Sequence, residues 1–244
     1  MLNIYGDRGN IITLTRRCQW RGIDVEVINM GVGTPVDKEQ VDIMFVGGGQ
    51  DKEQLTVCED FKGIKGTSIK EAVEDGIVLL SICGGYQLLG HFFKTGTGEV
   101  LQGISLFDAW TIAGNRRFIG NVLVESEVVG DGQPRTLVGF ENHSGRTFLG
   151  SGVKPLGRVL VGFGNNGDDA TEGAVYRNAY GCYLHGSLLP KNPWFADHLI
   201  LTALRRRYGS HVELEPLDDT VENTAHESVI GHMKRLGTIR SGVR

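Results

Sequence analysis

One stretch of the sequence decides the fold: Leu79-Leu80-Ser81-Ile82-Cys83-Gly84-Gly85-Tyr86-Gln87-Leu88-Leu89-Gly90. It continues a nearly unbroken apolar run that begins at Ile77, which is typical of a strand buried on both faces of a sheet. The run ends at Cys83, and the residues after it predict a helix that starts at once. A strand followed directly by a helix makes a sharp turn, which holds the turning residue at the carboxyl edge of the sheet.

Cys83 stands at this predicted turn, and its surroundings determine its chemistry. The two glycines that follow lack the Cβ atoms that would clash in a tight turn. The helix N-terminus points at the sulfur and stabilises the thiolate, which is the nucleophilic form. The backbone N–H of Gly84 would face an oxyanion formed when the sulfur attacks. The alternative is a buried structural cysteine beside a glycine-rich turn, but the pattern favours a catalytic nucleophile.

A thiolate nucleophile needs a base, for which histidine is the usual choice. His185 follows the apolar run Tyr180–Leu184, so it also lies at a strand end and is expected at the same edge of the sheet as Cys83. His143, in a segment flanked by glycines, is its rival, and the residues alone leave both open. Four other histidines fall within predicted helices and are expected to be structural or exposed: His91, His198, His226 and His232.

The first third of the chain alternates predicted strands and helices. Strands are expected at Ile23–Ile28 and Val41–Val46, and helices at Gly9–Arg21 and Ser68–Asp75. Such alternation predicts an α/β fold in which helices flank a parallel sheet. The opening strand, Leu2–Tyr5, is short for this architecture. Either the first strand is very short or the true start of the protein lies upstream of residue 1.

Residues 100–183 differ, because their glycine-rich alternating segments predict strands and hairpins with little helix. Helix returns at Pro193–Tyr208, where Pro193 suits the first turn, and a last helix is expected near residues 221–235. We therefore expect an enzyme domain over residues 1–212 and a C-terminal helix with a polar tail over residues 213–244. The strands expected in the middle region are Phe118–Ser126, Leu137–Phe140, Arg158–Phe163 and Ala174–Tyr176.

The composition excludes several classes of protein. The 244 residues are 40% hydrophobic, which is enough for a substantial core, and the net charge of −4 comes without a long basic stretch, so nucleic acid is not an expected partner. No apolar run approaches the ~20 residues of a membrane span, and no signal peptide is evident. The four cysteines form no CxxC pair and fit no zinc spacing. We expect a cytoplasmic protein without a metal site.

A second glycine run, Gly47-Gly48-Gly49-Gln50-Asp51, follows the strand predicted at Val41–Val46. It lacks the lysine and hydroxyl residue of a P-loop, and its spacing differs from that of a dinucleotide site. Backbone N–H groups there could instead line an oxyanion hole or hold a substrate carboxylate.

Taken together, these motifs resemble class I glutamine amidotransferases of the cobyric-acid-synthase-like branch. Within that branch the chain is similar to the glutaminase subunits of lipid II isoglutaminyl synthases. The resemblance spans nearly the whole chain and implies a three-layer, flavodoxin-like α/β fold with a mixed, mainly parallel sheet. The segments that carry it are Leu2–Asn10, Gly47–Asp51, Cys83–Gly90, Gly139–Thr147, Tyr183–Gly186 and Leu189–Asn192.

The resemblance also implies roles for individual residues. Cys83 matches the nucleophile and His185 the base. Gln87 matches a residue that contacts glutamine, and Arg117 matches an arginine that holds the glutamine α-carboxylate, although the adjacent Arg116 leaves this assignment uncertain by one place. The backbone groups expected to hold the oxyanion and glutamine are those of Gly48, Gly49 and Gly84.

The chain departs from the usual class I pattern after its base. Class I enzymes carry His-x-Glu, whose carboxylate orients the imidazole, but position 187 here is serine. The glutaminase subunits that the chain resembles share this absence. The missing acid is expected either from Glu141 or, as the favoured hypothesis, from a partner subunit. Asn121 also replaces an aspartate that is usual in the family, a difference of little weight.

The implied reaction is hydrolysis of glutamine to glutamate and ammonia. The resemblance implies a heterodimer in which ammonia passes to a Mur-ligase-like synthetase, which amidates the D-glutamate of lipid II in peptidoglycan synthesis. Cofactors are expected only on that partner, as ATP and Mg²⁺. The alternatives are amidation of another acceptor, such as cobyrinate, and a non-catalytic glutamine-binding module. A DJ-1-like or peptidase relative is a further alternative, which the Gly-Tyr-Gln sequence at positions 85–87 disfavours.

Overall fold

The computed structural model describes residues 7–49, 51–128 and 133–236. Its central sheet contains β1 (Ile43–Val46), β2 (Val78–Ile82), β10 (Ala179–Cys182) and β9 (Ala174–Tyr176), in the order β1-β2-β10-β9. The first three strands are parallel and β9 is antiparallel. All five residues of β2 are buried, as expected for the middle of a sheet covered on both faces. The mixed, mainly parallel sheet is therefore confirmed.

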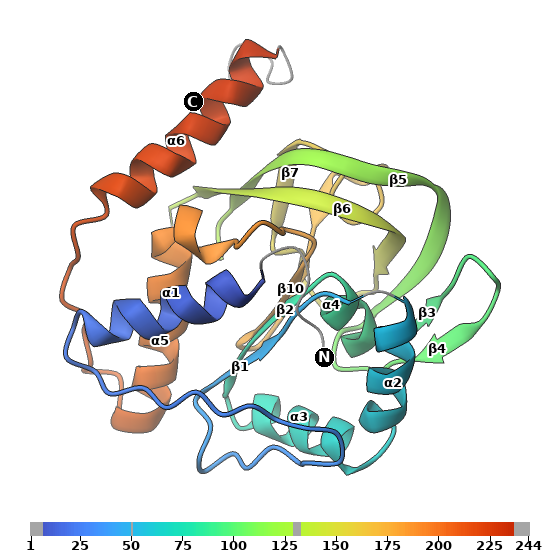
Figure 1. The fold of residues 1–244 in the computed structure, drawn as a ribbon, viewed down its shortest axis with the longest axis horizontal. Coiled ribbons are helices and arrows are strands. Elements are labelled where there is room, and N and C mark those ends of the chain that lie inside the picture. The colour runs from blue at the N-terminus through green and yellow to red at the C-terminus, as the bar shows by residue number, and fades with distance from the viewer. Residues whose placement is uncertain (1–6, 50, 129–132, 237–244) are drawn as a thin grey trace.

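Helices cover both faces of the central sheet. In Figure 1, α1 (Arg8–Gln19) and α5 (Pro193–Tyr208) lie on one side, and α2 (Asp51–Phe61), α3 (Ile64–Glu74) and α4 (Gly84–Leu89) lie on the other. This is the three-layer arrangement that the alternating pattern predicts. Within the ranges given above, no helix combines the length and apolar character that a membrane span requires.

A second sheet occupies the other end of the molecule, as the strand-rich middle of the sequence predicts. Its strand order is β4-β3-β5-β7-β8, and the long strand β6 pairs with β5. The β5–β6 hairpin shifts register between Ala113 and Phe118, so one stretch of β5 leaves the regular ladder. The strands are β3 (Phe92–Lys94), β4 (Val100–Gln102), β5 (Ala109–Ser126), β6 (Arg135–Leu149), β7 (Gly157–Val161) and β8 (Thr171–Glu172).

The strand expected at Ile23–Ile28 is wrong. The segment joins no sheet, and Val25, Val27 and Ile28 are all exposed. Alternating apolar and polar residues indicate that a segment could bury one face as a strand. A strand also needs a neighbouring strand to pair with, and this segment has none in the described structure. The other short strand expected near the front, Leu2–Tyr5, lies outside the described residues.

The C-terminal helix α6 (Thr220–Arg235) packs against the second sheet. Met233 is buried in a small cluster with Leu123 of β5 and Val138 of β6. A short 3₁₀ helix, Leu189–Lys191, lies beside α6, and its Lys191 carbonyl is bonded to His226. The boundary expected at residue 213 stays a prediction.

Arg17 joins the beginning of the chain to its end. Its side chain is 1% exposed, and it bonds Asp197 of α5 at 2.7 Å and Asp219, at the start of α6, at 2.6 Å. Arg21 adds a second bond to Asp197 at 2.7 Å. A buried guanidinium is tolerated only when carboxylates neutralise it and satisfy its N–H groups, so α1 is held in place by both C-terminal helices.

Candidate active site

Cys83 occupies the sharp turn that the sequence predicts. Its backbone has φ +50° and ψ −106°, a conformation that L-residues rarely adopt. Its N–H donates to the carbonyl of Cys182 at 2.8 Å, which is the last bond between β2 and β10. Its own carbonyl accepts the N–H of Gln87 at 2.9 Å, which is the first helical bond of α4. One residue thus ends the strand and starts the helix.

The glycines around Cys83 permit close contact between two chain segments. A Cβ atom on Gly84 would lie 2.6 Å from Gln54 Nε2 and 3.1 Å from the backbone nitrogen of Gly49. A Cβ atom on Gly85 would lie 2.7 Å from the carbonyl oxygen of Val46. The helix start therefore packs directly on the end of β1. The structure thus brings together Gly49 and Gly84, two of the expected oxyanion-hole residues, at the turn that directly follows Cys83.

His185 lies close enough to Cys83 for the cysteine to raise the pKa of its imidazole, and its side chain is 1% exposed. Its backbone exchanges two hydrogen bonds with Phe140 of β6, at 2.9 and 3.1 Å. The second sheet therefore holds the segment that follows β10 and carries His185. Its rival, His143, is buried and stacks on Tyr183 at 3.6 Å between ring centroids, with Nδ1 bonded to the carbonyl of Gly145. Of the two candidates, the structure brings His185 to the cysteine.

Asp7 places a carboxylate beside His185, where the serine at position 187 offers none. Its Oδ1 lies 3.3 Å from Nδ1 of His185, and its Oδ2 accepts the N–H of Gly48 at 2.7 Å. Asp7 is fully buried. It stands at the N-cap position of α1 but makes no capping bond with its side chain. An aspartate just before a helix is also typical of a helix cap, and nothing near it in the sequence marks it as a neighbour of His185.

Glu141, the internal acid expected as an alternative, has a different role. Its carboxylate accepts the N–H groups of Phe163 and Gly164 at 2.9 and 3.0 Å, so it holds the turn after β7. Among the described residues, the acid beside His185 is Asp7, from the segment before α1, and not Glu141. An acid donated by a partner subunit stays a prediction.

The environment of His185 favours its charged form. Burial lowers the pKa of the imidazole, but the hydrogen bonds to Asp7 and Cys83, together with the charges of both, outweigh burial and raise the pKa to about 9. The ring is therefore protonated at neutral pH. An imidazolium beside a cysteine stabilises the thiolate, which is the state that attacks a carbonyl carbon.

The remaining predicted residues are placed as follows. The N–H of Gly48 is donated to Asp7, so in this structure it holds the acid. Gln87 is buried, accepts a bond from Gln54 at 2.8 Å and donates to the Tyr183 hydroxyl at 3.1 Å. It lies one helical turn from Cys83, in a network that joins α4 to α2 and to the residue after β10.

The two arginines lie where β5 leaves the regular ladder. Arg117 is exposed and donates to Asn142 Oδ1 at 2.6 Å. The guanidinium of Arg116 lies 5.0 Å from the Phe163 ring centroid. The contact described for Arg117 is structural, and its role toward glutamine stays a prediction.

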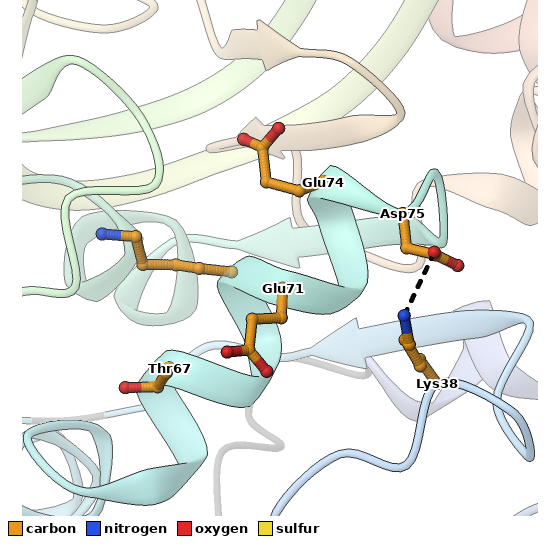
Figure 2. Close-up of a pocket in the computed structure, with 6 residues that line it drawn as sticks. Lys38, Thr67, Glu71, Glu74 and Asp75 are labelled. Atoms are coloured by element: carbon orange, nitrogen blue, oxygen red, sulfur yellow. Dashed lines mark hydrogen bonds and ion pairs between the residues drawn. The ribbon is translucent and has the colours of Figure 1, made fainter.

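A surface hollow of about 560 Å³ lies away from this site (Figure 2). Lys38 and five residues of and after α3 line it, and a 3.3 Å ion pair between Lys38 and Asp75 crosses one side. The charged side chains that line it are exposed, and two of them, Lys38 and Asp75, already pair with each other. The hollow is therefore not a candidate binding site for glutamine. Among the described residues no cluster of histidine, cysteine and acidic side chains is arranged to hold a metal.

Comparison with known proteins decides the family. Residues 1–193 match the model of the CobB/CobQ-like glutamine amidotransferase domain. The chain belongs to this family. Members of the family similar to this chain include the subunit GatD of the glutamine-hydrolysing lipid II isoglutaminyl synthase of Staphylococcus aureus strain N315. That protein is 41% identical over 234 residues, which cover 96% of this chain and 93% of the relative.

Two further relatives and one solved structure place the chain within the family. The GatD subunit of Streptococcus pneumoniae is 37% identical, covering 93% of this chain and 86% of the relative. A probable cobyric acid synthase of Methanocaldococcus jannaschii is 29% identical over 64% of this chain but only 32% of its own length. A crystal structure of a glutamine amidotransferase, 18% identical, superimposes with a TM-score of 0.54, covering 83% of this chain and 96% of that one. The likeness in fold agrees with the flavodoxin-like architecture expected for this family.

Proposed function

We propose that this chain is the glutamine-hydrolysing subunit of a lipid II isoglutaminyl synthase. The observation that carries the proposal is the group Cys83–His185–Asp7, assembled at one sheet edge in a chain that matches GatD subunits over most of its length. A nucleophile, a proton carrier and an orienting acid are the parts that hydrolysis of an amide requires.

The reaction begins with the Cys83 thiolate, which attacks the side-chain amide carbon of glutamine and forms a C–S bond. The carbonyl electrons move to oxygen, and backbone N–H groups of Gly49 and Gly84 stabilise the oxyanion. His185 gives its proton to the amide nitrogen, so ammonia leaves and a thioester remains. Water then attacks the thioester, His185 accepts a proton from it, and glutamate is released with the thiolate restored.

Asp7 determines which ring nitrogen of His185 takes part. Its carboxylate accepts the Nδ1–H of the ring, so Nε2 is the nitrogen left for Cys83 and the leaving group. Because Asp7 is itself held by the N–H of Gly48, the glycine run supports the base as well as the substrate. An acid fixed in this way keeps the imidazole in one tautomer and orientation.

The ammonia is expected to pass to a Mur-ligase-like synthetase subunit. That partner would use ATP and Mg²⁺ to activate the α-carboxylate of the D-glutamate in the lipid II stem peptide, and ammonia would convert it to D-isoglutamine. The pair would act in the cytoplasm, where ATP and the lipid II head group are both available. Cobyrinate amidation is less well supported, because the cobyric acid synthase match covers only 32% of that relative.

The proposal is tested with glutamine labelled by ¹⁵N at its side-chain amide. The purified chain, the synthetase subunit of the same organism, ATP, Mg²⁺ and lipid II are incubated together, and lipid II is analysed by mass spectrometry. We expect ¹⁵N in the product, and none when Cys83→Ala replaces the wild-type chain. Release of labelled ammonia without any label in lipid II would show that the acceptor is a different molecule.

A further inference from the structure

Strand β10 loses one of its two neighbouring strands, β9, shortly before His185, while its pairing with β2 continues to Cys182. It pairs with β9 from Ala179 to Gly181, where Gly181 stands opposite Ala174. Two steps further in the same register, Tyr183 would stand opposite Glu172. The chain turns away before this point at Gly173, whose φ is +68°, and a Cβ atom there would lie 2.4 Å from the carbonyl oxygen of Gly181.

Glu172 completes the ladder with its side chain instead of its backbone. Its Oε1 accepts the N–H of Tyr183 at 2.5 Å. Its backbone meanwhile belongs to β8, where it pairs with Gly157 in the second sheet. A single residue therefore joins the two sheets at the end of the strand that carries the base.

The carboxyl group of Glu172 lies in an unusual environment. It is 1% exposed, and its Oε2 has no hydrogen-bond partner among the residues that the structure describes. Burial raises the pKa of the group to about 8, and the nearby Glu141 adds to this, while the N–H of Tyr183 and the charge of His185 lower it. The group is therefore mainly neutral at pH 7 and accepts the Tyr183 bond without placing a second charge beside His185.

Tyr183 links Glu172 to the active site, because its backbone is bonded to Glu172 and its side chain contacts residues near Cys83. Its hydroxyl is bonded to Gln87 and, at 2.6 Å, to Thr147, and its ring stacks on His143. The side chain is thus fixed by other elements, and the backbone N–H is fixed by Glu172. His185 is the second residue after Tyr183, so a displacement of this backbone would move the imidazole relative to Cys83 and Asp7.

We propose that Glu172 is a positioning residue for His185, and that it acts by replacing the backbone partner that β10 loses after Gly181. The proposal rests on the proposed glutaminase function. It differs from a purely structural role because it requires one acceptor atom at Oε1 and requires the base, not only the fold, to respond when that atom is removed.

Glu172→Gln and Glu172→Leu separate these roles. Glutamine keeps a neutral acceptor at Oε1, whereas leucine has a similar size and no acceptor. We expect Glu172→Gln to retain kcat for glutamine hydrolysis within about threefold, and Glu172→Leu to lose about tenfold or more with KM changed by less than about twofold. If Glu172→Leu does not fold, Glu172→Asp replaces it, because its shorter side chain withdraws the acceptor and should also lower kcat.

The second measurement follows His185 directly, by NMR titration of imidazole-labelled protein. When the backbone loosens, the bond from His185 to Asp7 weakens, so its pKa should fall by about one unit in Glu172→Leu and stay unchanged in Glu172→Gln. The matched control is Ser126→Ala, which removes a buried bond to the Leu156 carbonyl elsewhere in the second sheet and should lower Tm without changing kcat or the His185 pKa.

Wild-type kcat and an unshifted His185 pKa in Glu172→Leu would overturn the proposal, as would equal effects in Ser126→Ala. If the wild-type chain does not hydrolyse glutamine even when the synthetase subunit is added, the proposed function fails, and the NMR titration still decides whether Glu172 positions His185.

Discussion

Asp7 Oδ1 lies 3.3 Å from His185 Nδ1, although 178 residues separate them in the sequence. The contact exists because α1 begins at the same sheet edge at which β10 ends. It changes the interpretation of the serine at position 187, where class I enzymes carry a glutamate. The chain itself places a carboxylate beside this imidazole, and that carboxylate comes from the opposite end of the sequence.

Cys83→Ala should abolish glutamate release while the protein stays folded, because it removes the sulfur that forms the thioester. A glutamine analogue that alkylates cysteine should label Cys83 before the other three, as measured by peptide mass spectrometry. Cys58→Ala is the control, since that sulfur bonds the Gln102 carbonyl away from the site. Continued turnover by Cys83→Ala would contradict the assignment.

Asp7→Asn should lower kcat by about a hundredfold or more, by analogy with other triads that lose their acid. Asparagine still accepts the N–H of Gly48, so the fold should survive, but it removes the charge that helps to keep His185 protonated. The measurement is steady-state glutamate release together with Tm. Asp24→Asn, at an exposed aspartate, is the matched control and should behave as wild type; a similar loss in both variants would argue against a specific role for Asp7.

The His185 pKa of about 9 in the folded protein, against an ordinary value of 6.5, makes stability depend on pH. The native state holds this proton more tightly than the unfolded chain. The contribution is therefore fully present below about pH 6.5, declines above it and is lost as the pH rises through about 9. The difference in Tm between wild type and His185→Gln should shrink across that window. A difference that grows with pH would mean that the folded pKa lies below 6.5.

Arg117→Ala should raise KM for glutamine about ten- to a hundredfold, because a lost charge-assisted bond to a carboxylate is worth roughly 1.5–3 kcal/mol. Its bonds to Asn142 are exposed, so Tm should change little. Arg116→Ala is tested alongside it. If only Arg116→Ala raises KM, the carboxylate is held by the neighbouring residue, and if neither does, the role belongs elsewhere.

The isolated chain should hydrolyse glutamine, because Asp7 completes the site without a second subunit. Glutamate release is measured at saturating glutamine with and without the synthetase subunit. A partner that only receives ammonia should change the rate modestly. A rate that is near zero alone and rises steeply on addition of the partner would restore the hypothesis that another subunit completes the active site.

Local patterns predicted the parts of the site that depend on local structure. The apolar run before Cys83 and the glycines after it define a turn that needs no distant information. The choice of catalytic base could be narrowed to His185 and His143, and His185 was expected beside Cys83 because the carboxyl ends of parallel strands meet at one edge of the sheet. Asp7 could not be found, since its contact depends on how α1 is placed against β10. The strand predicted at Ile23–Ile28 was wrong for a related reason. The alternation of apolar and polar residues indicates that a segment could form a strand, but it does not show whether a neighbouring strand is available to pair with it.

Arg17 has a consequence for the order of events during synthesis. Its two carboxylate partners, Asp197 and Asp219, follow it by 180 and 202 positions along the chain, so they leave the ribosome long after α1 does. Until they emerge, the guanidinium of α1 has no partners with which to be buried, so the helix that begins beside Asp7 cannot dock. Cys83 is therefore synthesised well before the catalytic centre can be assembled around it, and hydrolysis of glutamine can begin only after Asp219 has emerged.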